Sequence, residues 1–560
     1  MINSDTDKKA GDSVRARRRK RARASLFSQG EPMLWLTGGG LAISLLMIVG
    51  LLMLVFYQGM GTFWPAEVPR FETRDGQVFM GEVTRQEQTA EKGQETRKLV
   101  RTGNFDLTGE HFRWINGKDI VKRTLPPWAV VIERTEWGIF YGFPKAFILD
   151  GQTVADDPAG TYEKFNEYHQ EVTQRREHRR ELETIDVGKV NHNLEKARLA
   201  VKSSELKYGK GSEPWETATS RYEAEEKRAT EEFKAIRQKI DALNRSNDRF
   251  VMLMETAQGQ EKKIPLDQIV RAYPVNRLDM FDKTAVYLSR WAEFLTAEPR
   301  EANSEGGVYP AIFGTVVMTF IMSLAVMPFG VMAALYLREY ARAGTIISIV
   351  RISINNLAGV PSIVFGVFGL GFFCYVIGAS IDQLFFAENL PNPTFGKGGV
   401  LWAALTLALL TLPVVIVATE EALAAVPNSM REGSYACGAS KWQTIKRIVL
   451  PRAMPGIMTG MILAMARGAG EVAPLMLVGA VKLAPELPVD GIFPYIHAQR
   501  SFMHLGFHIY DLGFQSQNSE AAKPMVFTTT LLLIGIVFLL NVVAVRLRTR
   551  LRKKFESSAF

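Results

Sequence analysis

Long apolar runs occur towards both ends of the chain, whereas its middle is rich in Glu, Lys and Arg. A helix that crosses the hydrocarbon core of a bilayer, about 30 Å thick, needs about 20 mostly apolar residues. Runs of about this length lie near Leu34 to Phe56, Ile312 to Leu337, Val360 to Ile377, Val400 to Ala418, Gly456 to Val478 and Met525 to Val545. The pattern predicts six membrane-spanning helices, with a large polar insert between the first and the second.

Basic residues indicate which side of the membrane each connection occupies, because Lys and Arg near the ends of spans are retained in the cytoplasm. A basic run, Arg17 to Arg23, lies shortly before the first span, while the connections at 382–399 and 482–523 are poor in Lys and Arg. We therefore expect both termini in the cytoplasm and the insert on the opposite side. The other basic residues used here are Arg338, Arg342, Arg351, Arg431, Lys441, Lys446, Arg447, Arg452, Arg546, Arg548, Arg550, Arg552, Lys553 and Lys554.

The insert contains two kinds of sequence pattern, one typical of strands and one typical of helices. At 71–151 and again at 250–275, apolar and β-branched residues alternate between turn signals, which predicts a β-rich domain. Between these parts, apolar residues recur every three or four positions over 160–246, and Gly209 to Pro214 interrupts the repeat. Two antiparallel helices in a coiled-coil hairpin fit this pattern. The alternative is one long solvated helix with a kink, because the apolar seam is narrow.

Charge and cysteine content limit the other possibilities. The net charge of +9 would suit a nucleic-acid-binding protein, but the basic run precedes a span, which favours a topological role. The first apolar run is too long for a signal-peptide core, so we expect a retained anchor. The only two cysteines, Cys374 and Cys437, offer neither a disulfide framework nor a Cys-based metal site. The chain has no P-loop motif and no catalytic constellation, so we expect no enzyme active site, no bound metal and no cofactor of its own.

One motif lies between the fourth and fifth predicted spans. Glu432 is followed six positions later by Gly438, then by nine residues and by Ile448, Leu450 and Pro451 in an I-x-L-P pattern. This resembles the cytoplasmic EAA loop of ABC importer permeases, which presents a short helix to a separate ATPase. Gly438 permits a sharp turn between two helices, and we expect Pro451 to end the second helix just before the next span. The alternative is an ordinary amphipathic loop helix.

Three further stretches are similar to the PstA type of phosphate-import permease. They are Pro299 to Asn303 with Gly306 to Thr315, Asn356 to Gly366, and Arg467 to Leu475, within a resemblance that covers about residues 285 to 550. The resemblance implies an all-α membrane bundle of six transmembrane helices in the type-I ABC importer (MetI-like) fold. It also implies phosphate import across the bacterial inner membrane, a second homologous permease subunit, two ATPase subunits that bind ATP and Mg, and a periplasmic phosphate-binding protein.

The resulting organisation has five parts. We expect a basic cytoplasmic segment at 1–33, a first transmembrane helix at 34–57, an inserted α+β periplasmic domain at 61–307, an ABC permease domain with five spans at 308–548, and a basic tail at 549–560. The compact members of the family lack such an insert. It is expected to dock the binding protein, brace the partner permease, contact a sensor or serve as a structural cap, and the sequence does not choose among these.

Arg467 and Glu471 are the candidate substrate-pathway residues, because charges within a span are costly unless they face a partner or a wet cavity. Their spacing of four places them on one helix face. Arg467 would bind phosphate there, and Glu471 would hold the Arg467 side chain in place and weaken its binding of phosphate. The alternative is an ion pair that only fixes helix packing. Asn356 is a hinge residue or, less favoured, an anion ligand. Two other functions stay open: a permease for phosphonate, sulfate or molybdate, and a membrane-anchored sensory scaffold.

Overall fold

The computed structural model describes residues 31–88, 96–491, 493, 495–516 and 518–556. The basic run Arg17 to Arg23 and the last residues of the tail lie outside the described residues. The chain divides into two compact units, of which the first ends at Gly61 and the second begins at Thr62. The described part of the first unit is a single helix, α2 (Glu31–Gly61), made almost entirely of apolar residues.

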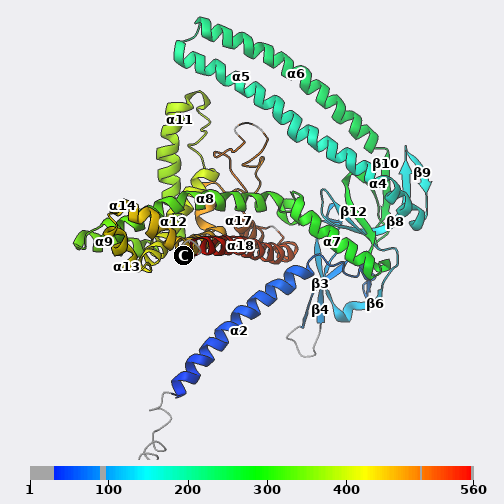
Figure 1. Ribbon diagram of the computed structural model, residues 1–560. Helices are drawn as coiled ribbons and strands as arrows, with labels where there is room; N and C mark the ends of the chain where they lie inside the picture. Colours follow the sequence, from blue (N-terminus) through cyan, green and yellow to red (C-terminus); the bar gives the residue numbers. More distant parts are fainter. Residues whose placement is uncertain (1–30, 89–95, 492, 494, 517, 557–560) are drawn as a thin grey trace, which may run out of the picture. The chain divides into compact units, whose positions relative to one another are not determined.

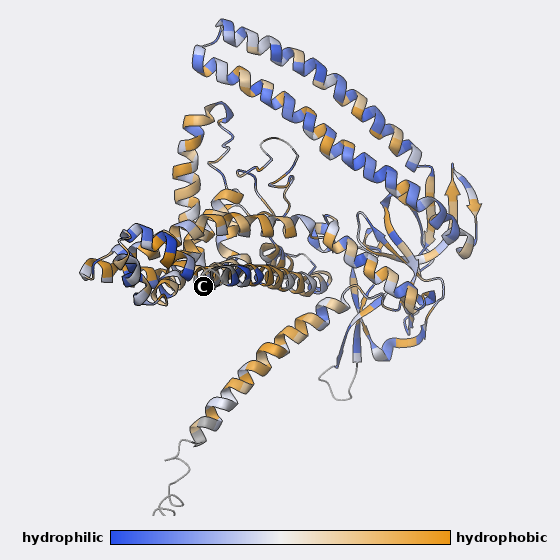
Figure 2. Cartoon of the chain, viewed as in Figure 1, coloured by the Kyte–Doolittle hydropathy of each residue, from blue (hydrophilic) through white to orange (hydrophobic). Residues whose placement is uncertain are grey.

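Among the residues that the structure describes, six helical stretches are long and apolar enough to cross a membrane, which confirms the number predicted from the sequence. They stand out as hydrophobic segments in Figure 2, in contrast to the largely hydrophilic pair α5 (Val187–Tyr208) and α6 (Glu213–Asn247). The six stretches are Trp35–Gly61, Tyr309–Tyr340, Ser362–Phe385, Val400–Ala424, Lys441–Gly470 and Ser519–Arg550.

The helices of the second unit's apolar part pack around α12 (Val400–Ala424), the most buried of the candidate spans. Its small and branched residues interlock with α8 (Tyr309–Leu335) and α15 (Leu450–Gly470) in one continuous core. Such close packing without a strong hydrophobic force favours small contact residues, and Gly460 of α15 lies against Ala418 of α12. The remaining elements here are η6 (Tyr336–Tyr340), α9 (Thr345–Leu357), α10 (Ser362–Phe368), η7 (Gly369–Gly378), α11 (Ala379–Phe385), α13 (Asn428–Ala436), α14 (Lys441–Thr444), η9 (Ile445–Val449), α16 (Ala473–Val478), α17 (Leu505–Tyr510), η10 (Asp511–Gln515) and α18 (Ser519–Glu556).

The fifth predicted span differs from the structure at both ends. The chain is helical from Lys441 through Pro451 to Gly470, so Pro451 does not end a helix as expected. A π-helical turn, η9, ends at Val449, two residues before Pro451, and its wider turn accommodates the proline ring and missing N–H. The apolar run also does not continue as one helix to Val478, because Glu471 is extended and a new short helix, α16, starts at Ala473.

The segment between α2 and α8 contains both strands and helices, so the chain is not entirely α-helical. Two three-stranded sheets have the orders β2-β1-β6 and β3-β4-β5, and a larger sheet has the order β11-β10-β8-β7-β12 with β9 paired to β8. Buried side chains alternate along β10, which packs Phe250, Met252 and Met254 into a core with Phe140 and Phe147 of β8. The strands are β1 (Arg70–Thr73), β2 (Val78–Met80), β3 (Glu82–Gln88), β4 (Thr96–Arg101), β5 (Phe112–Asn116), β6 (Ile120–Thr124), β7 (Val130–Arg134), β8 (Phe140–Leu149), β9 (Gln152–Ala155), β10 (Phe250–Glu255), β11 (Glu261–Pro265), β12 (Ile269–Pro274), β13 (Pro299–Arg300) and β14 (Glu305–Gly306).

The helices between β9 and β10 form a long pair. α4 (Pro158–Glu181) continues through a π-helical turn, η2 (Leu182–Asp186), into α5, and α6 returns beside them (Figure 1). Asp157 caps the start of α4 by accepting hydrogen bonds from two backbone N–H groups. Val190 and Ala229 are buried between α5 and α6, while most of the surface of both helices is charged.

A further helix, α7 (Met280–Thr296), links the strand-rich part to α8. A backbone hydrogen bond connects α7 to the residue before α8, since the N–H of Val308 donates to the carbonyl of Phe294 at 2.8 Å. The short elements not yet named are α3 (Phe105–Thr108) and 3₁₀ turns at Gly117–Asp119, Leu266–Gln268, Val275–Arg277, Glu301–Asn303 and Ala387–Asn389.

Candidate coupling loop and substrate pathway

The loop between the fourth and fifth candidate spans folds into two short helices, α13 and α14, joined by a sharp turn. Gly438 occupies the turn with a φ of 81°, and its N–H donates to the carbonyl of Tyr435 at 2.9 Å. A side chain at this φ would be strained, which is why the turn requires glycine. Ser440 then caps α14 in a capping box with Gln443, so the second helix starts immediately after the turn.

Two contacts hold the loop helices to each other and to the span below them. The hydroxyls of Ser434 and Thr444 are 2.8 Å apart and bridge α13 to α14. Of the predicted anchors, Ile448 and Leu450 are only half-buried, whereas the intervening Val449 is fully buried in a cluster with Leu423 of α12. Val449 lies four residues after Ile445 and four before Ala453, which are both buried, so this spacing places it on the core face of the helix.

Arg431 attaches α13 to the ends of two spans. Its guanidinium donates to Oε1 of Glu339, at the end of the second span, at 2.9 Å, and to the carbonyls of Leu423 and Val426 at the end of α12. Lys441 adds a hydrogen bond from α14 to the carbonyl of Glu339. In the sequence, Arg431 indicated only the topology of the loop, and Glu339 was not identified as its partner. The sequence feature that could have pointed to Glu339 is that it is an acidic residue at the end of an apolar run.

The outward side of the loop combines an acidic residue with aromatic side chains. Glu432, Tyr435 and Trp442 are all exposed, although large aromatic side chains are usually covered. Exposed aromatic residues next to a charge are typical of a surface that binds another protein. The loop therefore offers a compact docking surface that is anchored to α8 through η6 and to α12.

The charged pair Arg467 and Glu471 lies at the end of α15. The helix ends at Gly470, so the two residues do not share one helix face as expected; Glu471 has an extended backbone with a ψ of 140°. Nε of Arg467 is 3.7 Å from Oε1 of Glu471, which makes an ion pair across the helix end. The side chains are 36% and 21% exposed, so neither is sealed in the core and Arg467 remains open to an anion.

Two of the three stretches that resemble phosphate permeases meet in space. A Cβ on Gly366 of α10 would lie 2.7 Å from Cα of Pro474 in α16, so the two helices touch backbone to backbone at this point. Asn356 is exposed on α9, and within the described part of the chain no hydrogen bond or ion pair joins it to Arg467 or Glu471. The structure thus brings Gly366 close to the segment that follows Glu471, but it does not bring Asn356 into contact with the charged pair.

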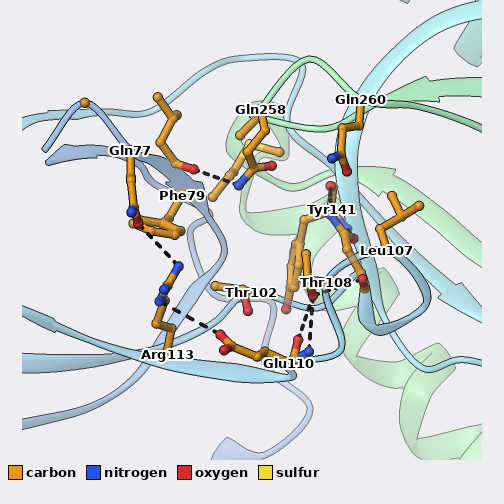
Figure 3. Close-up of a pocket in the computed structure, with 15 residues that line it drawn as sticks. Gln77, Phe79, Thr102, Leu107, Thr108, Glu110, Arg113, Tyr141, Gln258 and Gln260 are labelled. Carbon is orange, nitrogen blue, oxygen red and sulfur yellow. Dashed lines mark hydrogen bonds and ion pairs between the residues drawn. The ribbon is translucent and has the colours of Figure 1, made fainter.

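A separate cavity of about 540 Å³ lies in the strand-rich part, beside β2 and β5 (Figure 3). Sequence analysis did not identify it. Arg113 at its edge lies 3.9 Å from a carboxylate oxygen of Glu110 and hydrogen-bonds the amide oxygen of Gln77 at 3.5 Å. Arg113 is thus engaged by Glu110 and Gln77, and the described residues that line the cavity include no other Lys, Arg or His. We therefore do not assign the cavity to the substrate pathway.

Comparisons with known proteins show a similarity over the C-terminal part of the chain. Residues 326–555 match the family described as binding-protein-dependent transport system inner membrane component. The phosphate transport system permease protein PstA 1 of Mycobacterium tuberculosis (strain CDC 1551 / Oshkosh) is 43% identical over 175 residues, which are 31% of this chain and 52% of that protein. The probable ABC transporter permease protein YqgI of Bacillus subtilis (strain 168) is 29% identical over 271 residues, 48% of this chain and 86% of that protein.

Among solved structures, an inward-facing MetNI methionine ABC transporter is 19% identical to this chain. It covers 43% of this chain and 94% of its own, with a TM-score of 0.32, too low to define the fold. The chain spans about half the length of the first curated relatives that it matches. Residues 326–555, somewhat less than half of the chain, are thus similar to the family of binding-protein-dependent transport system inner membrane components.

Proposed function

We propose that this chain is a PstA-type permease subunit of an ATP-driven phosphate importer and forms half of the translocation pore. The observation that carries the proposal is the compact loop of α13 and α14, which exposes Glu432 and is bound by Arg431 to the ends of two spans. The similarity of residues 326–555 to importer permeases supports the same function. The six spans would then adopt the type-I importer arrangement, with both termini cytoplasmic and the strand-rich insert periplasmic.

The loop would couple the membrane helices to two partner ATPase subunits, which bind ATP and Mg. A displacement of α13 is transmitted through Arg431 to Glu339 and to the end of α12 at the same time. Packed helix ends move as rigid elements, so one motion at the loop changes the position of two spans. A second homologous permease subunit would complete the pore, and a periplasmic phosphate-binding protein would deliver the substrate.

Arg467 would meet phosphate within this pore. A guanidinium recognises a phosphate oxygen pair by two parallel hydrogen bonds, and the half-exposed side chain is accessible for this. Glu471 competes with the anion for Arg467, which weakens binding enough to allow release. The exposure of both side chains favours this role over a purely structural ion pair, because an ion pair that fixes packing is expected to be buried. Asn356, which lies apart from the pair, would act as a hinge.

Uptake of radiolabelled phosphate into vesicles that hold the complete complex tests the proposal. The native chain is compared with Arg467→Gln, with ATPase binding as the control for assembly and sulfate as the competitor. We expect native uptake that resists sulfate and a loss of about 10- to 100-fold in the variant, because one charged hydrogen-bonding partner is removed. If sulfate competes equally well, the substrate is another oxyanion. Normal uptake by the variant would show that Arg467 only fixes packing.

A further inference from the structure

The outer surface of α7 carries an unpartnered row of apolar side chains. Phe281, Leu288 and Leu295 recur every seven residues and are 85%, 60% and 38% exposed. Ala285 and Ala292 lie between them on the same face and are also exposed. We call these five residues the outer stripe. It contains no charged or hydrogen-bonding side chain over four turns of helix, which is unusual for a surface that faces water.

The opposite face of α7 is fixed to the strand-rich part by charges. Arg290 donates to Oε1 of Glu133 at 2.7 Å, and Arg271 of β12 donates to Oε2 of Glu293 at 3.0 Å. Val286 packs on the core that contains Val131 and Tyr273. The helix is therefore held in one rotational setting, and the outer stripe cannot turn inward to be covered by its own chain.

The ends of two candidate spans place α7 at the level of the membrane surface. The first span ends at Gly61, and the ring of Phe63, two residues later, lies 5.1 Å from that of Trp291 on α7. At the other end, the N–H of Tyr309, the first residue of α8, donates to the carbonyl of Ala297 at 3.2 Å. A helix tethered this closely to both spans has no room to stand far from the bilayer.

Aromatic residues on the flank of α7 agree with this depth. Trp64 lies 5.7 Å from Tyr287, and Phe63 and Trp291 continue the group. Trp and Tyr gather at the boundary between lipid headgroups and acyl chains, where one side of the ring is dry and the other is wet. The aromatic flank and the outer stripe thus lie where a membrane interface would meet the helix.

We propose that α7 is an interfacial helix that lies in the plane of the membrane and buries its outer stripe in lipid at the headgroup boundary. The occupant of the stripe is lipid because α7 is joined at Tyr309 to α8, a candidate span whose apolar side chains, such as Phe320 and Leu324, are also exposed. In this position α7 fixes the height and orientation of the strand-rich part on the membrane. The inference does not depend on the identity of the transported substrate.

The test uses nitroxide labels on the complete complex in vesicles of phosphatidylethanolamine and phosphatidylglycerol. The background is Cys437→Ser, because Cys437 is exposed and Cys374 is buried. Labels at Leu288→Cys and at the smaller Ala292→Cys probe the stripe. Leu324→Cys on α8 serves as the lipid control, and Tyr208→Cys on α5 serves as the aqueous control, since both side chains are exposed.

Oxygen concentrates in lipid, whereas a nickel chelate stays in water. Each reagent shortens the relaxation time of a label that it can reach, so the ratio of the two effects reports whether the label lies in lipid or in water. We expect the oxygen-to-nickel ratio of the stripe labels to lie below that of Leu324→Cys, which is deeper in the bilayer, and to exceed that of Tyr208→Cys by about tenfold, as for a helix buried about 5–10 Å in the interface. A ratio equal to that of Tyr208→Cys would overturn the proposal, because the stripe would then face water. Shielding from both reagents would also overturn it, because a protein partner would then cover the stripe.

Discussion

Arg431 on α13 and Glu339 at the end of the second span form an ion pair of 2.9 Å between side chains that are only 13% and 9% exposed. Their positions are 92 residues apart in the chain. The pair joins the loop of α13 and α14 to the end of the second candidate span, so a shift of the loop moves that span.

Breaking this pair should separate ATP hydrolysis from transport. We expect Arg431→Ala to keep the ATPase bound but to lower phosphate uptake by at least about tenfold. The reason is that removing one partner of a buried ion pair destabilises the structure around it by about 3–5 kcal/mol. Hydrolysis and uptake are measured in the same vesicles. Arg447→Ala is the matched control, because Arg447 is exposed on η9. Equal coupling in Arg431→Ala and Arg447→Ala would contradict a transmitting role for Arg431.

Two glycines of the same loop should respond in opposite directions to alanine. Gly438 has a φ of 81° and open space around its missing side chain, so Gly438→Ala should destabilise the turn by about 1–2 kcal/mol through backbone strain alone. Gly433 lies within α13 with nothing near a Cβ, so Gly433→Ala should stabilise the helix by up to about 1 kcal/mol. Hydrogen exchange of residues 428–444 measures both. The same sign of change for the two variants would rule out this account of the turn.

Removal of the negative charge tests whether Glu471 moderates the binding of phosphate by Arg467. In Glu471→Gln the ion pair of 3.7 Å is lost, so Arg467 should hold phosphate more tightly. We expect the concentration for half-maximal uptake to fall while the maximal rate falls about tenfold or less, because release becomes slow. Uptake kinetics over a range of phosphate concentrations give both values. A packing role alone predicts less folded protein with an unchanged half-maximal concentration.

Glu133 should make the strand-rich part sensitive to acid. Burial acts to raise the pKa of Glu133, but the charges of Arg290 and Arg271 outweigh it and hold the pKa below its usual range. A lowered carboxylate pKa gives stability that is complete above the unfolded-state pKa, about 4.3, and is lost as pH falls through the folded-state value. Glu133→Gln should therefore lower the unfolding temperature at neutral pH, and the difference from the native chain should shrink below about pH 4.

Thermal unfolding of the purified complex over pH 3 to 8 measures this difference, with pH values chosen about the ordinary carboxyl range. Glu261→Gln is the control, because Glu261 pairs with Lys145 on the surface and should change little. A constant difference between Glu133→Gln and the native chain at all pH values would show that Glu133 acts by packing rather than by charge.

The sequence by itself determined the number of helices, among the described residues, that are long and apolar enough to span a membrane, and the place of the sharp turn in the loop between the fourth and fifth of them. Hydropathy is a local sum, so a run such as Val400 to Ala418 reports a span regardless of its neighbours, and α12 covers it. The glycine six positions after Glu432 also predicts the turn locally, because the turn requires a residue with a positive φ at that position. The coiled-coil hairpin and the domain limits remain predictions that rest on periodicity and composition.

Only the tertiary structure decided how these pieces are joined. Hydropathy alone does not register the end of α15 at Gly470, because Ala473 to Val478 is as apolar as the residues before it; the packing of Pro474 against Gly366 fixes the new helix there. Nor does any local signal pair Arg431 with Glu339, since an ion pair between distant residues exists only after the helices that carry them have packed. Local energies choose helix or strand, whereas the contacts between elements choose which charges meet.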